Sequence, residues 1–204
     1  MGKIRDAERT RQKILNAAKE EFCEKGYTGA RIESIAKRAG LNKQLIYHYF
    51  KNKEALIDEM ISYFAKSVPT ENLTLPSNPV DIASFRFHVN IHHLMDFLKF
   101  TAWEVIDDIP NDTIGAESRK KVLQSYVEDM KVKQEKGLVP KDLDPRFITL
   151  MMSSLTIYPL LYGKVTQMIT GLENKDEVFI EEWSTFLDQI SERIFLENKN
   201  VGED

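Results

Sequence analysis

The stretch that decides the fold is IESIAKRAGLNKQLIYHYF, residues 32–50. In its first half apolar side chains recur three and four residues apart, as one face of a helix requires. Gly40 can adopt the left-handed backbone that ends a helix, and Asn42 can cap the helix that follows. The second half has positions that point at least partly inward at Leu45, Ile46, Tyr49 and Phe50. The pattern predicts two short helices joined by a tight turn, as in a helix-turn-helix.

The outward side of the second helix carries side chains that suit DNA. Lys43, Gln44, Tyr47 and His48 project from its N-terminal end and along one side. Lysine and tyrosine can hold phosphates, and glutamine can read adenine through a paired donor and acceptor. The helix end adds free N–H groups and a positive dipole. A structural helical hairpin with a glycine turn is the alternative explanation of the spacing alone.

Helical patterning extends over the rest of the chain, without strand-like alternation. Apolar residues at helical spacing predict helices over residues 8–25 and 53–66. Residues 67–78 hold two prolines and read as a loop or linker. Further helices are expected up to about residue 107, over residues 117–136, from Asp144, and from Asn174 to near the end. The chain is therefore predicted to be all-α, with about nine helices.

Three local signals in the last third make sharper predictions. The helix that begins at Asp144 is apolar nearly all round, which indicates burial on more than one side. Pro159 lies inside it and should kink it, freeing a carbonyl one turn back. Asn174 with Glu177 three residues later predicts a capping box.

Composition and charge limit the class of protein. The 204 residues have one cysteine, Cys23, which favours a reducing cytoplasm, and the N-terminal residues lack the apolar core of a signal peptide. The most apolar stretch, residues 150–162, is too short and too polar to span a membrane. Residues 1–67 carry 14 Lys and Arg against 9 Asp and Glu, whereas the remainder carries 14 against 23. A basic segment joined to an acidic one is expected when only one part faces nucleic acid.

Residues 10–56, TRQKILNAAKEEFCEKGYTGARIESIAKRAGLNKQLIYHYFKNKEAL, resemble the DNA-binding domain of the tetracycline-repressor (TetR-type) family of bacterial regulators. The matching positions are Ile14, Leu15, Ala17, Ala18, Phe22, Gly26, Tyr27, Ile35, Ala36, Ala39, Gly40, Tyr47, Phe50, Lys53, Glu54, Ala55 and Leu56. The resemblance covers about the first 60 residues. It implies a three-helix DNA-binding domain over residues 1–52, a connecting helix over 53–67, and a larger helical effector-binding and dimerisation domain over 68–204.

The resemblance also implies roles for individual residues. Positions 43–45 would face base edges, and Tyr47, Tyr49 and Lys53 would lie at the DNA backbone. Ala30 stands where the family often has a hydroxyl residue, so Arg31 is expected to take over that phosphate contact. The expected DNA-contacting residues are Arg31, Lys43, Gln44, Leu45, Tyr47, His48, Tyr49 and Lys53.

Rings are concentrated between residues 85 and 104, where core packing explains most of them. A ligand pocket needs such walls together with a few polar groups. The expected ligand-binding residues are Phe85, His88, His92, Phe100, Trp103, Glu104, Tyr126, Tyr158 and Tyr162. His88, His92 and Asp96 share a helical face that could hold zinc, but two histidines without a Cys or an HExxH context are a weak signal, so no metal or cofactor is predicted.

These features predict a ligand-responsive DNA-binding regulator. By resemblance it would be a repressor, a homodimer paired through its last two helices, released from a palindromic double-stranded DNA operator by a small apolar or aromatic molecule. The alternative is an architectural or division-associated DNA-binding protein without an effector. An enzyme is not expected, because we find no nucleophile–base pair, phosphate loop or strong metal motif.

Overall fold

The computed structural model describes residues 2–67, 74–107 and 116–196, and half of the predicted loop at 67–78 lies outside these ranges. All regular structure in the described residues is helical. The described ranges contain ten α-helices, α1 to α10. Because a π turn joins α5 to α6 without a break, these two form one continuous helix, which gives nine helices in these ranges. The all-α prediction of about nine helices is confirmed. None of the described helices is long and apolar enough to cross a membrane.

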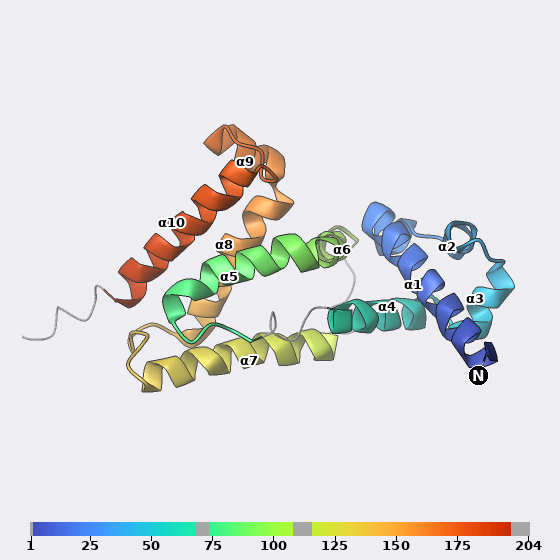
Figure 1. Cartoon of the computed structure of the whole chain (residues 1–204), viewed down its shortest axis with the longest axis horizontal. Helices are drawn as coiled ribbons and strands as arrows, with labels where there is room; N and C mark the ends of the chain where they lie inside the picture. The colour runs from blue at the N-terminus through green and yellow to red at the C-terminus, as the bar shows by residue number, and fades with distance from the viewer. Residues whose placement is uncertain (1, 68–73, 108–115, 197–204) are drawn as a thin grey trace, which may run out of the picture. The chain divides into compact units, whose positions relative to one another are not determined.

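The chain divides into two compact units, and the first contains residues 1–69 and 96–118. Its helices are α1 (Gly2–Gly29), α2 (Ile32–Ala39), α3 (Lys43–Tyr49), α4 (Lys53–Ser67) and most of α6 (Met95–Ile106). Helix α1 packs against α2 and α4, and α2 packs against α3 (Figure 1). The core includes Ile14, Leu15, Ala18, Phe22, Ile35, Ile46, Phe50, Leu56, Ile57 and Phe100.

Helix α1 runs past the glycine at which the sequence pattern ends it. Gly26 has the positive φ expected of a left-handed cap, with φ 69° and ψ −174°, but the chain resumes a helical turn through Gly29. A residue with a Cβ rarely adopts this backbone conformation. Beside this kink, the indole Nε1 of Trp103 on α6 donates to Cys23 O at 3.2 Å, and Asp107 Oδ2 accepts from the Thr28 N–H at 2.9 Å. Gly26 therefore allows α6 to approach the end of α1 closely.

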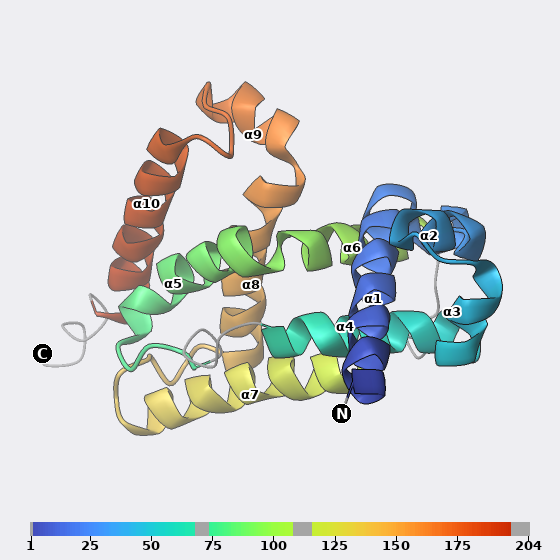
Figure 2. The same cartoon turned by 45° about the vertical axis from the view of Figure 1, so that its right-hand side comes forward.

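The second unit contains residues 70–95 and 119–204. Its elements are a 3₁₀ turn (Pro79–Asp81), α5 (Ile82–Val89), the π turn (Asn90–Leu94), α7 (Ala116–Glu135), α8 (Pro145–Leu161), α9 (Gly163–Thr170) and α10 (Glu177–Phe195). Helix α5 contacts both α8 and α10, and it crosses α8 in both views (Figures 1 and 2). Phe87 of α5 is fully buried and meets the Phe179 ring of α10 edge-on. The core of this unit is thus built around α5.

Pro159 lies inside α8 and leaves the carbonyl of Leu155 without its intrahelical partner, as the sequence predicts. The indole N–H of Trp183 on α10 donates to that carbonyl at 3.2 Å, which restores the missing hydrogen bond. The predicted capping box is wrong. Asn174 instead donates to Pro159 O and Leu160 O at the end of α8, because the short helix α9, which sequence reasoning missed, turns the chain back. Asp176 occupies the N-cap position of α10.

Candidate nucleic-acid interface and effector residues

The turn between α2 and α3 is built by local hydrogen bonds. Gly40 adopts φ 67° and ψ 33°, and its N–H bonds back to the end of α2. The Leu41 N–H reaches Ala36 O at 2.9 Å, which is the wider bond of a Schellman ending. Asn42 Oδ1 accepts from the Leu45 N–H at 2.8 Å and starts α3. The two ends of the turn are therefore set by Gly40 and Asn42, the residues from which the sequence predicts them.

Helix α3 is divided as its pattern predicts. Ile46 and Phe50 are 1% and 3% exposed and lie in the core of the first unit. Leu45 and Tyr49 are half-buried, so each combines packing with access to the surface. The exposed side chains on or next to α3 are Lys43, Gln44, Tyr47 and His48, with Arg31 exposed at the start of α2. The buried apolar face of α3 therefore fixes this helix so that its polar face lies toward solvent.

Lys43 is not a free cation in this structure. Its ammonium donates to the Glu33 carboxylate on the first turn of α2 and lies 5.7 Å from the centre of the Tyr47 ring. The hydrogen bond to Glu33, with the attraction of its charge, raises the pKa of Lys43, and the same bond lowers the pKa of Glu33. Glu33 therefore competes with any phosphate or base for the charge of Lys43.

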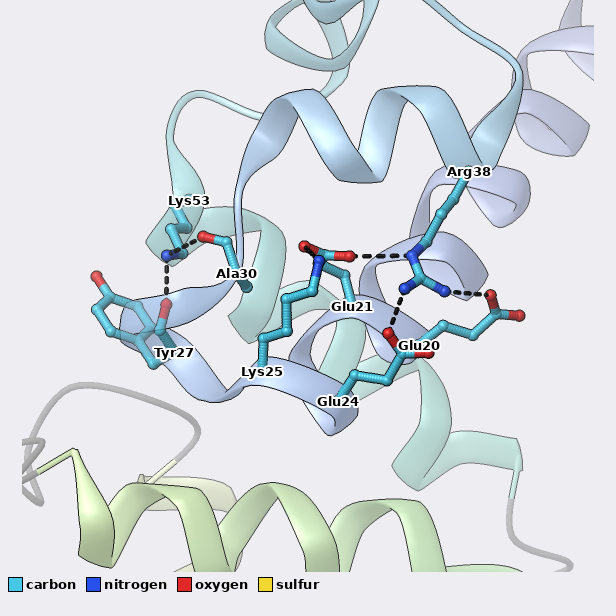
Figure 3. Close-up of polar contacts among 8 residues, drawn as sticks. All are labelled: Glu20, Glu21, Glu24, Lys25, Tyr27, Ala30, Arg38 and Lys53. Atoms are coloured by element: carbon cyan, nitrogen blue, oxygen red, sulfur yellow. Dashed lines mark hydrogen bonds and ion pairs between the residues drawn. The ribbon is translucent and has the colours of Figure 1, made fainter.

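Lys53 begins α4, but its ammonium points back to the end of α1 (Figure 3). It donates to Tyr27 O and, at 2.6 Å, to Ala30 O. It also lies 4.6 Å from the centre of the Tyr27 ring, and desolvation lowers the pKa of Lys53. The last carbonyls of a helix carry partial negative charge, so a cation there stabilises the helix end. Lys53 thus uses two of its three N–H groups to fasten α1 to α4.

A buried carboxylate joins α1 to α2. The Glu21 side chain is fully buried and accepts from Lys25 at 2.8 Å and from Arg38 Nε at 2.9 Å (Figure 3). Arg38 also binds Glu20 and Glu24. Burial alone would raise the pKa of Glu21, but the hydrogen bonds from Lys25 and Arg38 outweigh it, and the pKa is lowered. This ion cluster fixes α2, the helix that precedes the turn into α3. The cluster was not predicted from the sequence.

The expected ligand-binding residues lie in different units. Phe100 is buried in the core of the first unit against Phe22, with ring centres 6.5 Å apart, and the half-buried Trp103 of the same unit binds the α1 backbone. Glu104 is half-buried in that unit as well. The remaining expected residues, Phe85, His88, His92, Tyr126, Tyr158 and Tyr162, lie in the second unit.

Within the second unit these six residues do not form one cluster. His88 Nε2 is 3.1 Å from Ser184 Oγ on α10, and its ring stacks on His92 with centres 6.0 Å apart. Tyr158 and Tyr162 stack on each other, 4.8 Å apart, and are 47% and 55% exposed. Tyr126 instead lies against Arg86, a residue that the sequence pattern did not single out.

The candidate metal and redox groups have other partners. Asp96, the third member of the suggested zinc set, pairs with Lys19 at 2.8 Å and with Lys99 at 3.7 Å. In the described ranges, no three or more His, Cys, Asp or Glu side chains are grouped as a metal ion would need. Cys23 Sγ donates to Asp96 O at 3.2 Å, and burial raises the pKa of the thiol to about 11. Cys23 therefore stays a protonated packing residue at neutral pH.

Comparison with known proteins agrees with this architecture. The sequence profile "Bacterial regulatory proteins, tetR family" matches residues 14–60. The HTH-type transcriptional regulator YhgD of Bacillus subtilis is 30% identical over 157 residues, 71% of this chain and 78% of its own length. The HTH-type transcriptional repressor SCO4008 of Streptomyces coelicolor is 25% identical, over 82% of this chain and 86% of its own length.

Solved structures show the same fold over nearly the whole length. The putative transcriptional regulator SCO4942 of Streptomyces coelicolor superposes with a TM-score of 0.74 at 22% identity, covering 92% of this chain and 98% of that one. A putative TetR-family regulator of Mesorhizobium loti gives 0.62 at 22% identity, covering 92% and 96%. The profile covers the helix-turn-helix, and the sequence relatives extend into the second unit. The chain therefore belongs to the tetR family of bacterial regulatory proteins and is a transcriptional regulator.

Proposed function

We propose that this protein is a cytoplasmic repressor that leaves a palindromic operator when a small molecule binds its second unit. The observation that carries the DNA-binding half of the proposal is the division of α3. Ile46 and Phe50 are locked in the core, while Lys43, Gln44 and Tyr47 face solvent beside a helix N-terminus. A short helix held in this way can lie in a major groove without losing its register.

We assign different roles to the exposed residues of this surface. Gln44 reads a base edge, Lys43 and Leu45 lie beside it, and Tyr47, His48, Tyr49 and Arg31 lie along the DNA backbone. Lys53 contributes mainly by holding α1 to α4, and its third N–H remains for a phosphate. Gln44→Ala should therefore relax preference at one base pair by about 1–3 kcal/mol. Lys53→Ala should lower both the stability and the affinity for all DNA.

A two-fold dimer would present two copies of α3 to half-sites about 34–36 Å apart or somewhat more. Exposed apolar side chains on the last three helices support this pairing. They are Phe147, Leu150, Tyr158 and Tyr162 on and next to α8, Val165, Met168 and Ile169 on α9, and Val178 and Phe186 on α10. Met168 and Ile169 are 83% and 74% exposed, which is costly unless another surface covers them. Ile169→Asp should shift the protein from dimer to monomer in sedimentation, with Lys136→Asp as a polar-surface control.

The chain passes from α5 through the π turn directly into α6, whose end is bonded to α1. We propose that α6, together with α4, carries the response to effector into the first unit. A ligand that favours one arrangement of these helices would thereby change how well the two α3 helices of the dimer fit the operator.

Gel-shift titration on the protein's own upstream DNA tests the proposal. We expect salt-sensitive binding that a scrambled sequence does not reproduce, and release by at least one small molecule found in a thermal-shift screen. If the protein binds the scrambled sequence as well as its upstream DNA, the proposed repressor function is refuted. Selective binding that no small molecule affects would leave an effector-independent DNA-binding protein instead.

A further inference from the structure

Arg86 on α5 is a partly buried guanidinium that contacts two neutral side chains of the second unit. Its Nη2 donates to Ser153 Oγ on α8 at 3.1 Å. Its guanidinium carbon lies 4.7 Å from the centre of the Tyr126 ring on α7. Three helices therefore meet around one positive charge, and among the described residues no carboxylate forms an ion pair with it.

The partners of Arg86 satisfy only part of its hydrogen-bonding capacity. A guanidinium has five N–H donors and stays protonated in proteins. The Ser153 hydroxyl donates its own hydrogen to Thr149 O at 2.8 Å, so it can offer Arg86 only an acceptor lone pair. Burial disfavours the charged form and lowers the pKa of Arg86. A charge withdrawn from water in this way ordinarily has a counter-charge.

Neutral polar groups in the same region have hydrogen-bond partners. The buried hydroxyls of Thr149 and Thr156 donate to carbonyls of their own helix, both at 2.8 Å. Asn90 at the π turn donates to Thr156 O at 3.3 Å. The partly buried carboxylate of Asp188 on α10 interacts with His88, forms no ion pair with Arg86, and leaves its buried Oδ1 without a hydrogen-bond partner. Arg86 is therefore left with a neutral hydroxyl and an aromatic ring as its partners.

We propose that Arg86 is the anchor for the carboxylate of the effector, which is an organic monocarboxylate with an apolar body. Two parallel N–H groups of one guanidinium match the two oxygens of one carboxylate. The Ser153 hydroxyl holds the fork from one side, and the Tyr126 ring provides an apolar wall beside it. This inference rests on the proposed ligand-controlled function and makes its effector class specific.

Paired probes separate charge from shape. We would measure binding to the full-length protein by thermal shift and calorimetry, with hexanoate, benzoate and phenylacetate against hexanamide, benzamide and phenylacetamide. The variants are Arg86→Met, Arg86→Lys and, as a control, Arg146→Met, which removes an exposed guanidinium of α8 that pairs with Asp144. Far-ultraviolet circular dichroism and DNA binding without ligand confirm that each variant is folded.

At least one carboxylate should stabilise the wild-type protein saturably, and its amide should not. Arg86→Met should lose at least about 10-fold in affinity for it, and Arg146→Met should behave as wild type. Arg86→Lys keeps the charge without the fork and should also lose most of the affinity. If Arg86→Met does not fold, Arg86→Lys decides the outcome.

The proposal is overturned if no carboxylate binds better than its amide, or if the Arg86 variants bind it as wild type does. Gel shifts on the same preparations separate this from the proposed function. Release of the operator by neutral molecules alone would reject the carboxylate anchor and keep the repressor. Arg86-dependent carboxylate binding without any selective DNA binding would keep the anchor and reject the repressor.

Discussion

Gly26→Ala should destabilise the first unit by far more than a surface glycine replacement. At φ 69° and ψ −174° the residue lies in a region that is essentially restricted to glycine, which costs another residue about 1–3 kcal/mol. A Cβ would also lie 2.8 Å from Asp107 Oδ2 and 2.9 Å from Trp103 Cε3. Neither group is free to retreat, because Asp107 accepts from the Thr28 N–H and Trp103 donates to Cys23 O.

The strain needed to relieve those contacts adds about 1–3 kcal/mol to the destabilisation, the usual cost of inserting an extra carbon into a well-packed site. The expected loss is therefore about 2–6 kcal/mol, large against a typical domain stability of about 5–15 kcal/mol. Urea unfolding followed by tryptophan fluorescence would measure it. Gly29→Ala is the matched control, since Gly29 has no positive φ and its added Cβ would meet only Lys25 Cβ at 3.3 Å.

A double variant, Gly26→Ala with Trp103→Leu, separates the two contributions, with unfolding followed by circular dichroism because the remaining tryptophan, Trp183, lies in the second unit. If the close approach of α6 matters, Trp103→Leu should cost less in the Gly26→Ala background than in wild type. If Gly26→Ala loses less than about 1 kcal/mol, or no more than Gly29→Ala, the contact between α6 and the kink of α1 is not as close as described.

Three further changes test single groups. Glu33→Gln should raise affinity for all DNA by about 2- to 5-fold in gel shifts at low salt, because Lys43 no longer has to leave a carboxylate; unchanged or weaker binding would contradict this. Cys23 in the folded protein should react with iodoacetamide at pH 8 at least about 10-fold more slowly than in urea, since its thiol has a pKa of about 11, and equal rates would refute its burial. The lowered pKa of Glu21 means that its stabilising contribution is complete above its unfolded pKa and is lost as pH falls through the folded value. Glu21→Gln should therefore lower the free energy of unfolding by about 1–3 kcal/mol at pH 7 and make it fall less steeply with pH below pH 4.5. Glu24→Gln, at an exposed position, should leave that fall as steep as in the wild-type protein.

Sequence reasoning succeeds here wherever the signal is local. The Gly40 ending and the Asn42 cap each depend on residues within five positions, so their chemistry is visible in the sequence. Pro159 also acts locally on the helix that contains it. The sequence predicts the carbonyl that Pro159 frees, but not Trp183, which lies 28 residues from Leu155 and fills the vacancy.

Lys53 and Arg86 show why the candidate sites are harder to predict than the fold. Lys53 binds a carbonyl 23 residues away, and Arg86 binds a hydroxyl 67 residues away. Each is a cation on a helix, and neither helical periodicity nor composition distinguishes them from solvated cations such as Lys51. Their roles depend on what tertiary packing provides, namely two carbonyls for Lys53 and no carboxylate for Arg86. Lys53, with two N–H groups bonded to carbonyls, stabilises the fold, whereas Arg86, with a single hydroxyl acceptor, retains the capacity to bind a ligand. The difference between these two environments leads us to assign Lys53 mainly to positioning and Arg86 to the effector.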